Sequence, residues 1–171
     1  ADYDIESLMI QDGSMGFAEG EADAFINGNG VKKPRGIMSQ TFAYTGDNSR
    51  AWGEVQKIKT GVNGGFAAAG QADKLLDMAC GLRAIYQAKA VWGMNRFTLA
   101  EVMKLKDDTG NYIFLQGFNL QTGAFGTLLG HPVDASFDHM ADIATSSLSI
   151  IYGDLGAAYQ IADRRGISIV R

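Results

Sequence analysis

An Asn-Gly-Asn-Gly run near the start of the chain is the feature that most restricts how it folds. Residues 27–30 form this doubled turn signal, and Pro34 and Gly36 follow it. Asn and Gly tolerate the positive φ angles of tight turns, and proline cannot continue a helix because it lacks an amide hydrogen. A regular element therefore ends at this run, and an extended chain restarts at Ile37. We place the boundary between two lobes here.

Glycine is unusually frequent in the whole chain, with 22 glycines against 2 prolines in 171 residues. Glycine scattered without a collagen period indicates many turns and close backbone approaches. With 46% hydrophobic and 20% charged residues, the composition is that of a globular chain. A chain of this length supports one domain of ordinary size, or two small lobes, with a real core.

Charge and cysteine content exclude several classes of protein. The formal net charge is −4 and the longest basic run is Lys32-Lys33, which argues against a dedicated nucleic-acid reader. The single cysteine, Cys80, has no disulfide partner and no zinc spacing exists, so a reducing, cytosolic origin is the simplest interpretation. The sequence has no membrane-length apolar run and no signal peptide. Because it begins at Ala1 without methionine, we expect a processed product or a cut fragment.

The first predicted helix covers residues 4–26. Its apolar side chains recur mostly at helical spacing, with acidic residues between them. Gly13, Gly16 and Gly20 weaken it, at about 1 kcal/mol each relative to alanine. We therefore expect this helix to bend or to lie close to another backbone.

Two further helices and several strands follow. Residues 73–89 predict the best helix, and the sequence Thr98-Leu99-Ala100-Glu101 predicts a capping box that begins a helix ending near Leu105. Residues 39–70 predict loops and short strands, and residues 116–126 an exposed polar loop. The strand candidates are residues 90–94, 112–115, 128–133, 147–152, 158–162 and 167–170, the last two joined by a hairpin loop at 163–166. The fold class is α+β, with no internal repeat.

Two groups of residues have the residue types of ligand sites. Gly28-Asn29-Gly30 superficially resembles a phosphate-binding loop, but it lacks the Gly-Lys-Ser/Thr ending and follows a helix, so a structural turn is favoured. One cluster has the residue types of a metal site: His131, Asp134, Asp138 and His139. The neighbouring proline and strand signals favour a solvated surface loop over a metal site.

Nucleophiles and carboxylate pairs give no catalytic set either. Cys80 lies near the apolar stripe of the 73–89 helix, which favours a small buried thiol over a nucleophile. Asp107 and Asp108 are in a turn, and Asp73 and Asp77 are in the solvated first turn of a helix, where acids are favourable. The sequence therefore assigns no catalytic, cofactor-binding or metal residue, and the protein is predicted not to be an enzyme.

Three aromatic residues lie in the glycine-rich region after the first turn. Phe42, Tyr44 and Trp52 are residue types that stack on bases or sugars. Aromatics in short strands more often form cross-strand pairs in a core, so that interpretation is favoured. A small carbohydrate- or ligand-binding domain that uses Tyr44 and Trp52 stays open as a distant alternative.

The order of several short motifs resembles the major capsid proteins of tailed phages and prophages. The motifs are Phe25-Ile26-Asn27-Gly28-Asn29-Gly30, Pro34-Arg35-Gly36-Ile37, Ala90-Val91-Trp92-Gly93-Met94-Asn95-Arg96 with Thr98, Leu105-Lys106-Asp107-Asp108-Thr109-Gly110-Asn111-Tyr112, Gly130-His131-Pro132-Val133, Gly153-Asp154, Tyr159, Asp163-Arg164 and Gly166-Ile167. Each is short, but together they follow the family's order over nearly the whole chain.

This resemblance implies the Hong Kong 97-like (HK97-like) capsid fold, an α+β wedge with a peripheral (P) and an axial (A) domain. Residues 1–36 would be a partial P-domain, residues 37–152 the A-domain, and residues 153–171 the returning P-domain strands. The family's N-terminal arm, extended loop and closing C-terminal segment would be absent, so the chain is expected to be truncated at both ends. No residue is assigned to the lysine–asparagine crosslink of some relatives.

The implied function is that of a structural shell protein. It would self-assemble into pentamers and hexamers of an icosahedral head that encloses double-stranded DNA, contacted non-specifically because the chain is acidic. Expected partners are other copies, and beyond them a portal, scaffold, maturation protease and decoration proteins, in the virion and, during assembly, the host cytoplasm. The resemblance places the loop at residues 116–126 near the ring axis, and the fragment alone is expected to be monomeric or weakly associated. An encapsulin-type compartment shell is the nearest alternative.

Overall fold

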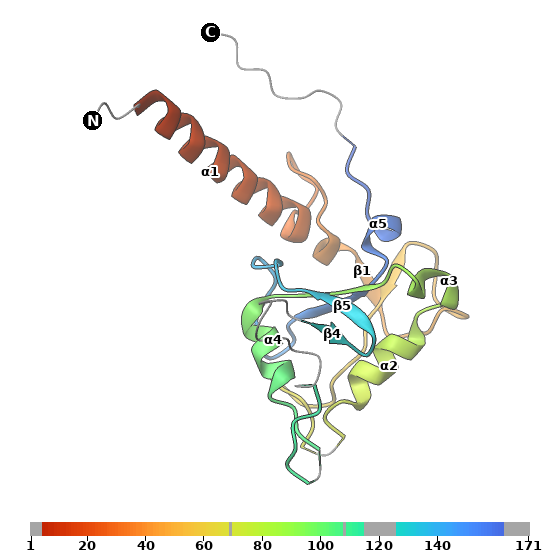
Figure 1. Ribbon diagram of the computed structural model, residues 1–171. Coiled ribbons are helices and arrows are strands. Elements are labelled where there is room, and N and C mark those ends of the chain that lie inside the picture. The colour runs from red at the N-terminus through yellow and green to blue at the C-terminus, as the bar shows by residue number, and fades with distance from the viewer. Residues whose placement is uncertain (1–4, 69, 108, 115–125, 163–171) are drawn as a thin grey trace.

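The computed structural model describes residues 5–68, 70–107, 109–114 and 126–162. A long helix, α1 (Ile5–Asn27), extends from a body of sheets and shorter helices (Figure 1). The predicted hairpin loop at 163–166 and strand at 167–170 lie outside the described residues, as do residues 116–125 of the loop predicted at 116–126. Among the helices that are described, none has the length and apolar character needed to cross a bilayer.

The body is built on a four-stranded sheet in the order β4-β5-β3-β6. Its centre is β3 (Val91–Met94), which pairs in parallel with β5 (His131–Asp134) and antiparallel with β6 (Ile150–Gly153). The short β4 (Thr127–Leu128) pairs antiparallel with β5. The predicted strands at 90–94 and 147–152 are therefore confirmed, within a few residues.

The core lies around β3. Trp92 and Met94 are fully buried, and the Trp92 indole Nε1–H donates to the backbone oxygen of Leu128 at 2.9 Å. The ring of Tyr152 lies 4.2 Å from that of Trp92. Gly93 leaves the space that this packing needs, because a Cβ there would lie 2.7 Å from Ile151 Cγ2. The other buried members of this cluster are Leu75, Leu99, Val102, Leu105, Leu128 and Ala135.

The predicted helix at 73–89 is wrong as a single element, because it is broken. It consists of α2 (Asp73–Gly81) and α3 (Ala84–Gln87), with Leu82 extended between them at φ −77° and ψ 134°. Glycine at the end of α2 is the expected stop signal, since glycine destabilises a helix interior. The break removes the second half of the predicted stripe from the core, so that Ile85 is 80% exposed.

Helix α4 (Arg96–Met103) is confirmed, but its predicted cap is wrong. The N-cap is Asn95, whose side-chain oxygen accepts a hydrogen bond from the Thr98 amide at 2.7 Å. Glu101 instead pairs with Lys104, at 2.7 Å. An N-cap side chain needs an amide two or three residues ahead, and Asn95 has that spacing to Thr98.

Two other predicted strands are corrected. Residues 128–133 form a hairpin of β4 and β5 instead of one strand, because Leu129 and Gly130 have φ angles of 52° and 82°. Positive φ at both central residues is the geometry of a type I′ hairpin turn. Residues 158–162 contain no strand; Ala158 is the last residue of the short helix α5 (Leu155–Ala158), which is capped by the Asp154 side chain. The predicted strand at 112–115 is described only as far as residue 114, and there Tyr112 forms a single bridge with Lys106.

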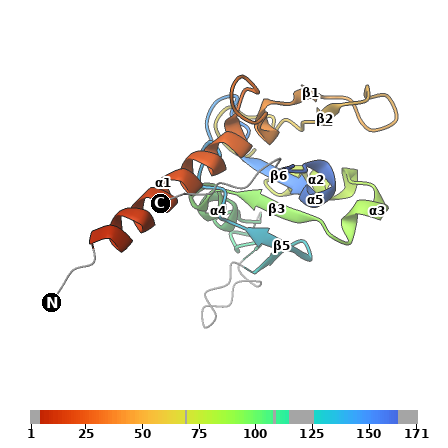
Figure 2. The ribbon, with the colours of Figure 1, turned by 90° about the horizontal axis from the view of Figure 1, so that it is seen from above.

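A second, two-stranded sheet covers the region predicted to be loops and short strands. It pairs β1 (Thr41–Ala43) in parallel with β2 (Glu54–Gln56), after the short 3-10 helix η1 (Ile37–Ser39). Figure 2 shows this small sheet beside the four-stranded one, with its connecting loop pointing away from α1. That loop, residues 44–53, matters for the surface described below.

Helix α1 differs from its prediction in one respect. It is helical over 23 residues, as expected, but it neither bends at its glycines nor packs them against another backbone (Figure 1). Apart from the adjacent residues and the backbone of the helix itself, no atom lies within 4 Å of the place where a Cβ on Gly13, Gly16 or Gly20 would be. The glycines weaken this helix without serving a contact inside the described chain.

This openness predicts the effect of one substitution. Gly13→Ala is expected to stabilise α1 by roughly 0.5–1 kcal/mol, since alanine loses less backbone entropy than glycine in a helix. Amide hydrogen exchange of the residues around position 13 measures the change, and slower exchange is the expected result. Unchanged or faster exchange would show that Gly13 has a packing role.

Candidate functional site

The exposed surface of α1 is a candidate contact surface. From Ile5 to Ala22 every residue is exposed, including Met9 and Phe17, each at 71%. The helix also contains five acidic residues and no lysine or arginine. Exposed large apolar side chains in this number make α1 a candidate site of interaction with another molecule or chain segment.

The C-terminal end of α1 is fixed to the body by backbone contacts. The Gly36 amide donates to the Gly28 oxygen at 2.7 Å, and the Asn27 side-chain amide donates to the His139 oxygen at 2.8 Å. A Cβ on Gly28 would collide with the backbone oxygens of Ala24 and Pro34. Gly28 and Gly36 are thus required because another part of the backbone lies too close for a side chain. Gly30 is required for a different reason, its positive φ of 79°. The turn predicted at residues 27–36 is confirmed.

A groove of about 570 Å³ separates α1 from the last described residues. The Tyr159 hydroxyl donates to the Arg35 oxygen at 3.0 Å, and the Phe25 and Tyr159 rings meet edge to face at 6.5 Å. The groove is lined by Phe25, Arg35 and Tyr159 together with Gly16, Phe17, Gly20, Glu21, Ala24, Pro34, Gln160, Ile161 and Ala162. Among the described residues that line this groove, we find no nucleophile paired with a base and an orienting group.

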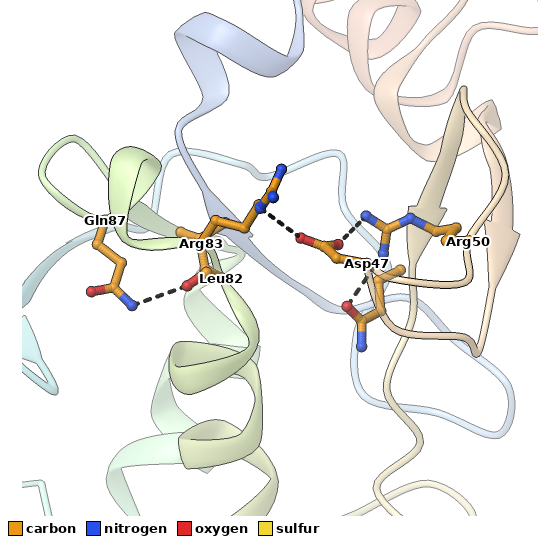
Figure 3. A network of polar contacts seen from close by, with 6 residues as sticks. Asp47, Arg50, Leu82, Arg83 and Gln87 are labelled. Carbon is orange, nitrogen blue, oxygen red and sulfur yellow. Dashed lines mark hydrogen bonds and ion pairs between the residues drawn. The ribbon is translucent and has the colours of Figure 1, made fainter.

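The opposite part of the body carries a polar network around Asp47 (Figure 3). Asp47 accepts from the Arg50 guanidinium at 2.5 Å and lies 4.0 Å from Arg83 Nε. Arg50 also donates to the Gln56 side chain, at 3.3 Å. This network ties the 44–53 loop to the junction of α2 and α3.

The aromatics of the 44–53 region are not in the core, so the predicted cross-strand core pairing is wrong for two of them. Trp52 is fully exposed, at 102%, and Tyr44 is 56% exposed. Two ammonium groups lie over the Tyr44 ring, Lys57 at 4.5 Å and Lys59 at 4.2 Å from its centre. Hydrogen bonding to Lys57, assisted by Lys59, lowers the pKa of the Tyr44 phenol. Phe42 is half-buried in β1, opposite Val55.

The residues weighed as metal ligands have separate structural roles. The His131 ring packs edge-on against Tyr152 at 5.4 Å, and Asp134 accepts from the Ser136 amide and hydroxyl at 2.9 and 2.6 Å. His139 contributes its backbone oxygen to the contact with α1, and Asp138 is exposed. Across the described residues, no three His, Cys, Asp or Glu side chains are grouped to hold a metal ion. Cys80, predicted to be buried, is exposed, because α2 ends one residue later.

The carboxylates of the predicted turn and helix start also have local partners. Asp107 accepts from the Thr109 hydroxyl at 2.7 Å and from the Thr109 and Asn111 amides at 2.9 and 2.8 Å. These bonds favour the ionised form, and the Thr109 hydroxyl contributes most to lowering the pKa of Asp107. Asp77 pairs with Lys74 at 2.8 Å and raises the pKa of Lys74.

The lowered pKa of Asp107 gives a pH prediction. Its folded pKa lies below the unfolded one, so the stabilisation is complete above about pH 4 and is lost as the pH falls through the folded pKa. Asp107→Asn is expected to lower Tm slightly at pH 7 and by less at pH 2. Thermal unfolding at both pH values measures this. An equal effect at the two values would contradict it.

Comparisons with known proteins identify the family of this chain. The family model described as the phage capsid family matches residues 1–171. The chain belongs to the phage capsid family. No curated protein matches it significantly. The family resemblance inferred from the motifs is therefore confirmed.

Solved capsid structures match this capsid-family chain as well. It is similar to the capsid of a native GTA (gene transfer agent) particle computed with C5 symmetry, with 36% identity and a TM-score of 0.79. The match covers 90% of this chain and 55% of that one. The capsid of an empty GTA particle gives 35% identity, the same TM-score, and coverage of 90% and 51%. The chain thus spans about half the length of the capsid chains it matches, and its α+β, HK97-like fold class is confirmed.

Sequence reasoning missed two features of the structure. The first is the exposure of Trp52, for which the glycine at position 53 was the available signal, since glycine is typical of a tight loop; its φ in the structure is 85°. The second is the hydrogen bonding of Asn95. Asn95 follows an apolar strand directly and precedes Thr98 by three residues, and this spacing is an N-cap signal. The Thr-x-x-Glu pattern a few residues later predicts a competing cap.

Proposed function

We propose that this protein is a major capsid subunit of a phage-like particle, whose copies assemble into pentamers and hexamers of an icosahedral shell around double-stranded DNA. The match of the whole chain to the phage capsid family carries this proposal. The likeness to GTA capsids, one of them solved with C5 symmetry, supports rings of identical subunits and favours a particle head over an encapsulin-type compartment. A structural protein needs no catalytic set, which agrees with a protein that is not an enzyme.

The proposed division into domains follows the same family. Residues 1–36 and 153–171 would belong to the P-domain, and residues 37–152 to the A-domain. The contacts of Tyr159 with Phe25 and Arg35 support this division, because they join the two ends of the described chain to each other. The four-stranded sheet, in which β6 ends at Gly153, supports an A-domain built around β3.

The proposed partners and location follow from the function. Other copies of the chain are the main partner, and a portal, scaffold, maturation protease and decoration proteins would act with the assembled shell. The protein would be located in the particle, and in the host cytoplasm during assembly. With a net charge of −4, it would contact packaged DNA non-specifically and weakly.

Electron microscopy of the protein in its natural length, expressed alone, tests the proposal. Closed shells, or rings of five and six copies, are the expected result. The 171-residue chain by itself is expected to stay monomeric or weakly associated in sedimentation, because the matched capsid chains are about twice as long. A natural-length protein that is monomeric at all concentrations would contradict the function.

A further inference from the structure

The basic residues of this acidic chain are unevenly distributed along it. Residues 24–72 contain six lysines and arginines but only two acidic residues, whereas the whole chain has a net charge of −4. Such a charge asymmetry is typical of a segment that contacts a polyanion. Lys32, Lys33 and Arg35 are in the turn that follows α1, and the other three bases are in the loop between β1 and β2 or directly after β2.

The two-stranded sheet of β1 and β2 sorts charged side chains onto opposite faces. In its parallel register, Phe42 lies opposite Val55. Because side chains alternate along a strand, Val55 and Lys57 are on one face and Glu54 is on the other. The Lys57 amide donates to the Ala43 oxygen at 2.8 Å, so the pairing of the two strands continues as far as Lys57. The two faces of this sheet therefore differ in charge.

The face that carries Lys57 holds two ammonium groups over one aromatic ring. The Nζ atoms of Lys57 and Lys59 lie 4.5 and 4.2 Å from the centre of the Tyr44 ring. We define this lysine face as Phe42, Tyr44, Val55, Lys57 and Lys59. Tyr44 is 56% and Val55 40% exposed, and Lys59 is exposed as well. The two strands form the outermost layer beside β6 (Figure 2), so this face is open to another molecule.

The acidic residues of this region do not neutralise the two lysines. Among the described residues, neither Lys57 nor Lys59 forms an ion pair. Asp47 is shared between two arginines, and Glu54 is on the other face of the sheet. Two like charges held over one ring repel each other, and an anion bound between them relieves that repulsion. The lysine face is therefore complementary in charge to a negatively charged ligand.

We propose that the lysine face binds phosphate groups of the double-stranded DNA that the shell encloses. Ammonium groups without a carboxylate partner suit the phosphodiester backbone, which supplies most of the non-specific affinity of proteins for DNA. Because ammonium groups already lie over the Tyr44 ring, this ring positions the lysines instead of stacking on a base, which favours duplex over single-stranded DNA. The inference rests on the proposed shell function and names the surface that would touch the contents of the shell.

A titration of the 171-residue chain with a short DNA duplex tests this contact. At low salt, the NMR resonances of Tyr44, Lys57 and Lys59 are expected to shift. The logarithm of the binding constant should fall with that of the salt concentration with a slope of about −2, since each neutralised phosphate contributes about −0.9. Lys57→Gln and Lys59→Gln should each reduce the slope to about −1. Lys89→Gln, at an exposed lysine outside this sheet, is the matched control and should leave the slope unchanged.

Variants of Tyr44 separate a built site from a general effect of net charge. Tyr44→Leu leaves the charge of the lysines unchanged but removes the ring that holds their two ammonium groups, so it should weaken duplex binding about threefold. Tyr44→Phe keeps the ring and should bind within about twofold of the wild type. Equal binding by the leucine variant and the wild type would show that the ring does not position the lysines, and would overturn the site.

Acetylation of lysines in assembled particles tests the contact in its natural setting. Lys59 is exposed, so an amine-reactive ester should modify it readily in empty shells of the natural-length protein. In DNA-filled shells it should react several times more slowly, since the high local concentration of packaged DNA keeps even a weak site occupied. Lys89 should react equally in both. Protection of Lys59 in empty shells as well would identify a second copy of the chain as the occupant and overturn the proposal.

The remaining outcomes distinguish this contact from the shell function on which it rests. Closed shells whose Lys59 reacts equally with and without DNA, and a duplex that shifts no resonance of Tyr44, would overturn the contact and leave the shell function standing. A natural-length protein that forms no shells would overturn the function, whereas the titration of the 171-residue chain would still report on the lysine face. Inorganic phosphate bound as tightly as the duplex, or single-stranded DNA bound more tightly, would identify a different ligand and overturn the contact with duplex DNA.

Discussion

Replacing Gly36 by alanine is expected to lower the free energy of unfolding by about 3 kcal/mol, the upper part of the range for overpacking. The added Cβ would lie 2.5 Å from the carbonyl carbon of Ile26 and 2.6 Å from the backbone nitrogen of Gly28. These are backbone atoms, which cannot rotate away as a side chain does. The turn would have to open, and the hydrogen bond from the Gly36 amide to Gly28 would be lost. Urea denaturation measures the change.

The matched control for this substitution is Gly46→Ala. Gly46 is an exposed loop glycine with no atom within 4 Å of its Cβ position, so its replacement should change stability by less than about 0.5 kcal/mol. Because the turn also fixes the end of α1, Gly36→Ala should accelerate hydrogen exchange at the C-terminal end of this helix. Equal stability of the two variants would show that the turn is not closely packed.

Asn95→Ala is expected to cost about 3 kcal/mol as well, for a different reason. Asn95 is 3% exposed, and its side-chain oxygen caps α4 while its nitrogen donates to the Met140 oxygen at 3.0 Å and to Asp142 at 2.6 Å. Loss of an N-cap costs about 1 kcal/mol, and each buried group left without a partner about 1–3 kcal/mol. Thermal and urea denaturation measure the sum.

Asn95→Asp separates the two contributions. The new carboxylate keeps the oxygen that caps α4 but removes the donor, and it places a negative charge against Asp142. This variant should be at least as unstable as the alanine variant at pH 7 and should regain stability as the pH falls, because protonation relieves the repulsion. Asn111→Ala, at an exposed asparagine, should change stability by less than about 1 kcal/mol. A flat pH profile for Asn95→Asp would argue against the contact with Asp142.

Local chemistry was sufficient to predict the elements whose signals lie close together in sequence. The turn at residues 27–36 follows from its own glycines and proline, and β3 from a short apolar run. Helix α1 was also predicted from its local spacing of apolar residues. The exposure of its first 18 residues was not predicted, because no pattern within a helix specifies what packs against it. The Asp107 turn also followed from its own residues, with Gly110 at a φ of 86°.

Predictions failed where two signals competed or where a distant segment decided. The stripe from Leu75 to Tyr86 has helical spacing, but the break after Gly81 turns Ile85 toward solvent. The run 128–133 has the apolar content of a strand, yet Leu129 adopts a positive φ that lets the chain fold back and pair β4 with β5. The first outcome follows from the competing stop signal at Gly81. In the second, Leu129 packs against the cluster around Trp92, to which segments far apart in the chain contribute.

The sequence by itself determined that this chain is an α+β member of a capsid family, because turn glycines, apolar runs and their order are written locally along it. Only the tertiary structure decided which of these elements meet. Residues 91–94, 131–134 and 150–153 are far apart in the sequence, and the parallel pairing of β3 with β5 and its antiparallel pairing with β6 bring them into one sheet. Strand direction is a property of long-range hydrogen bonding, which no local pattern specifies.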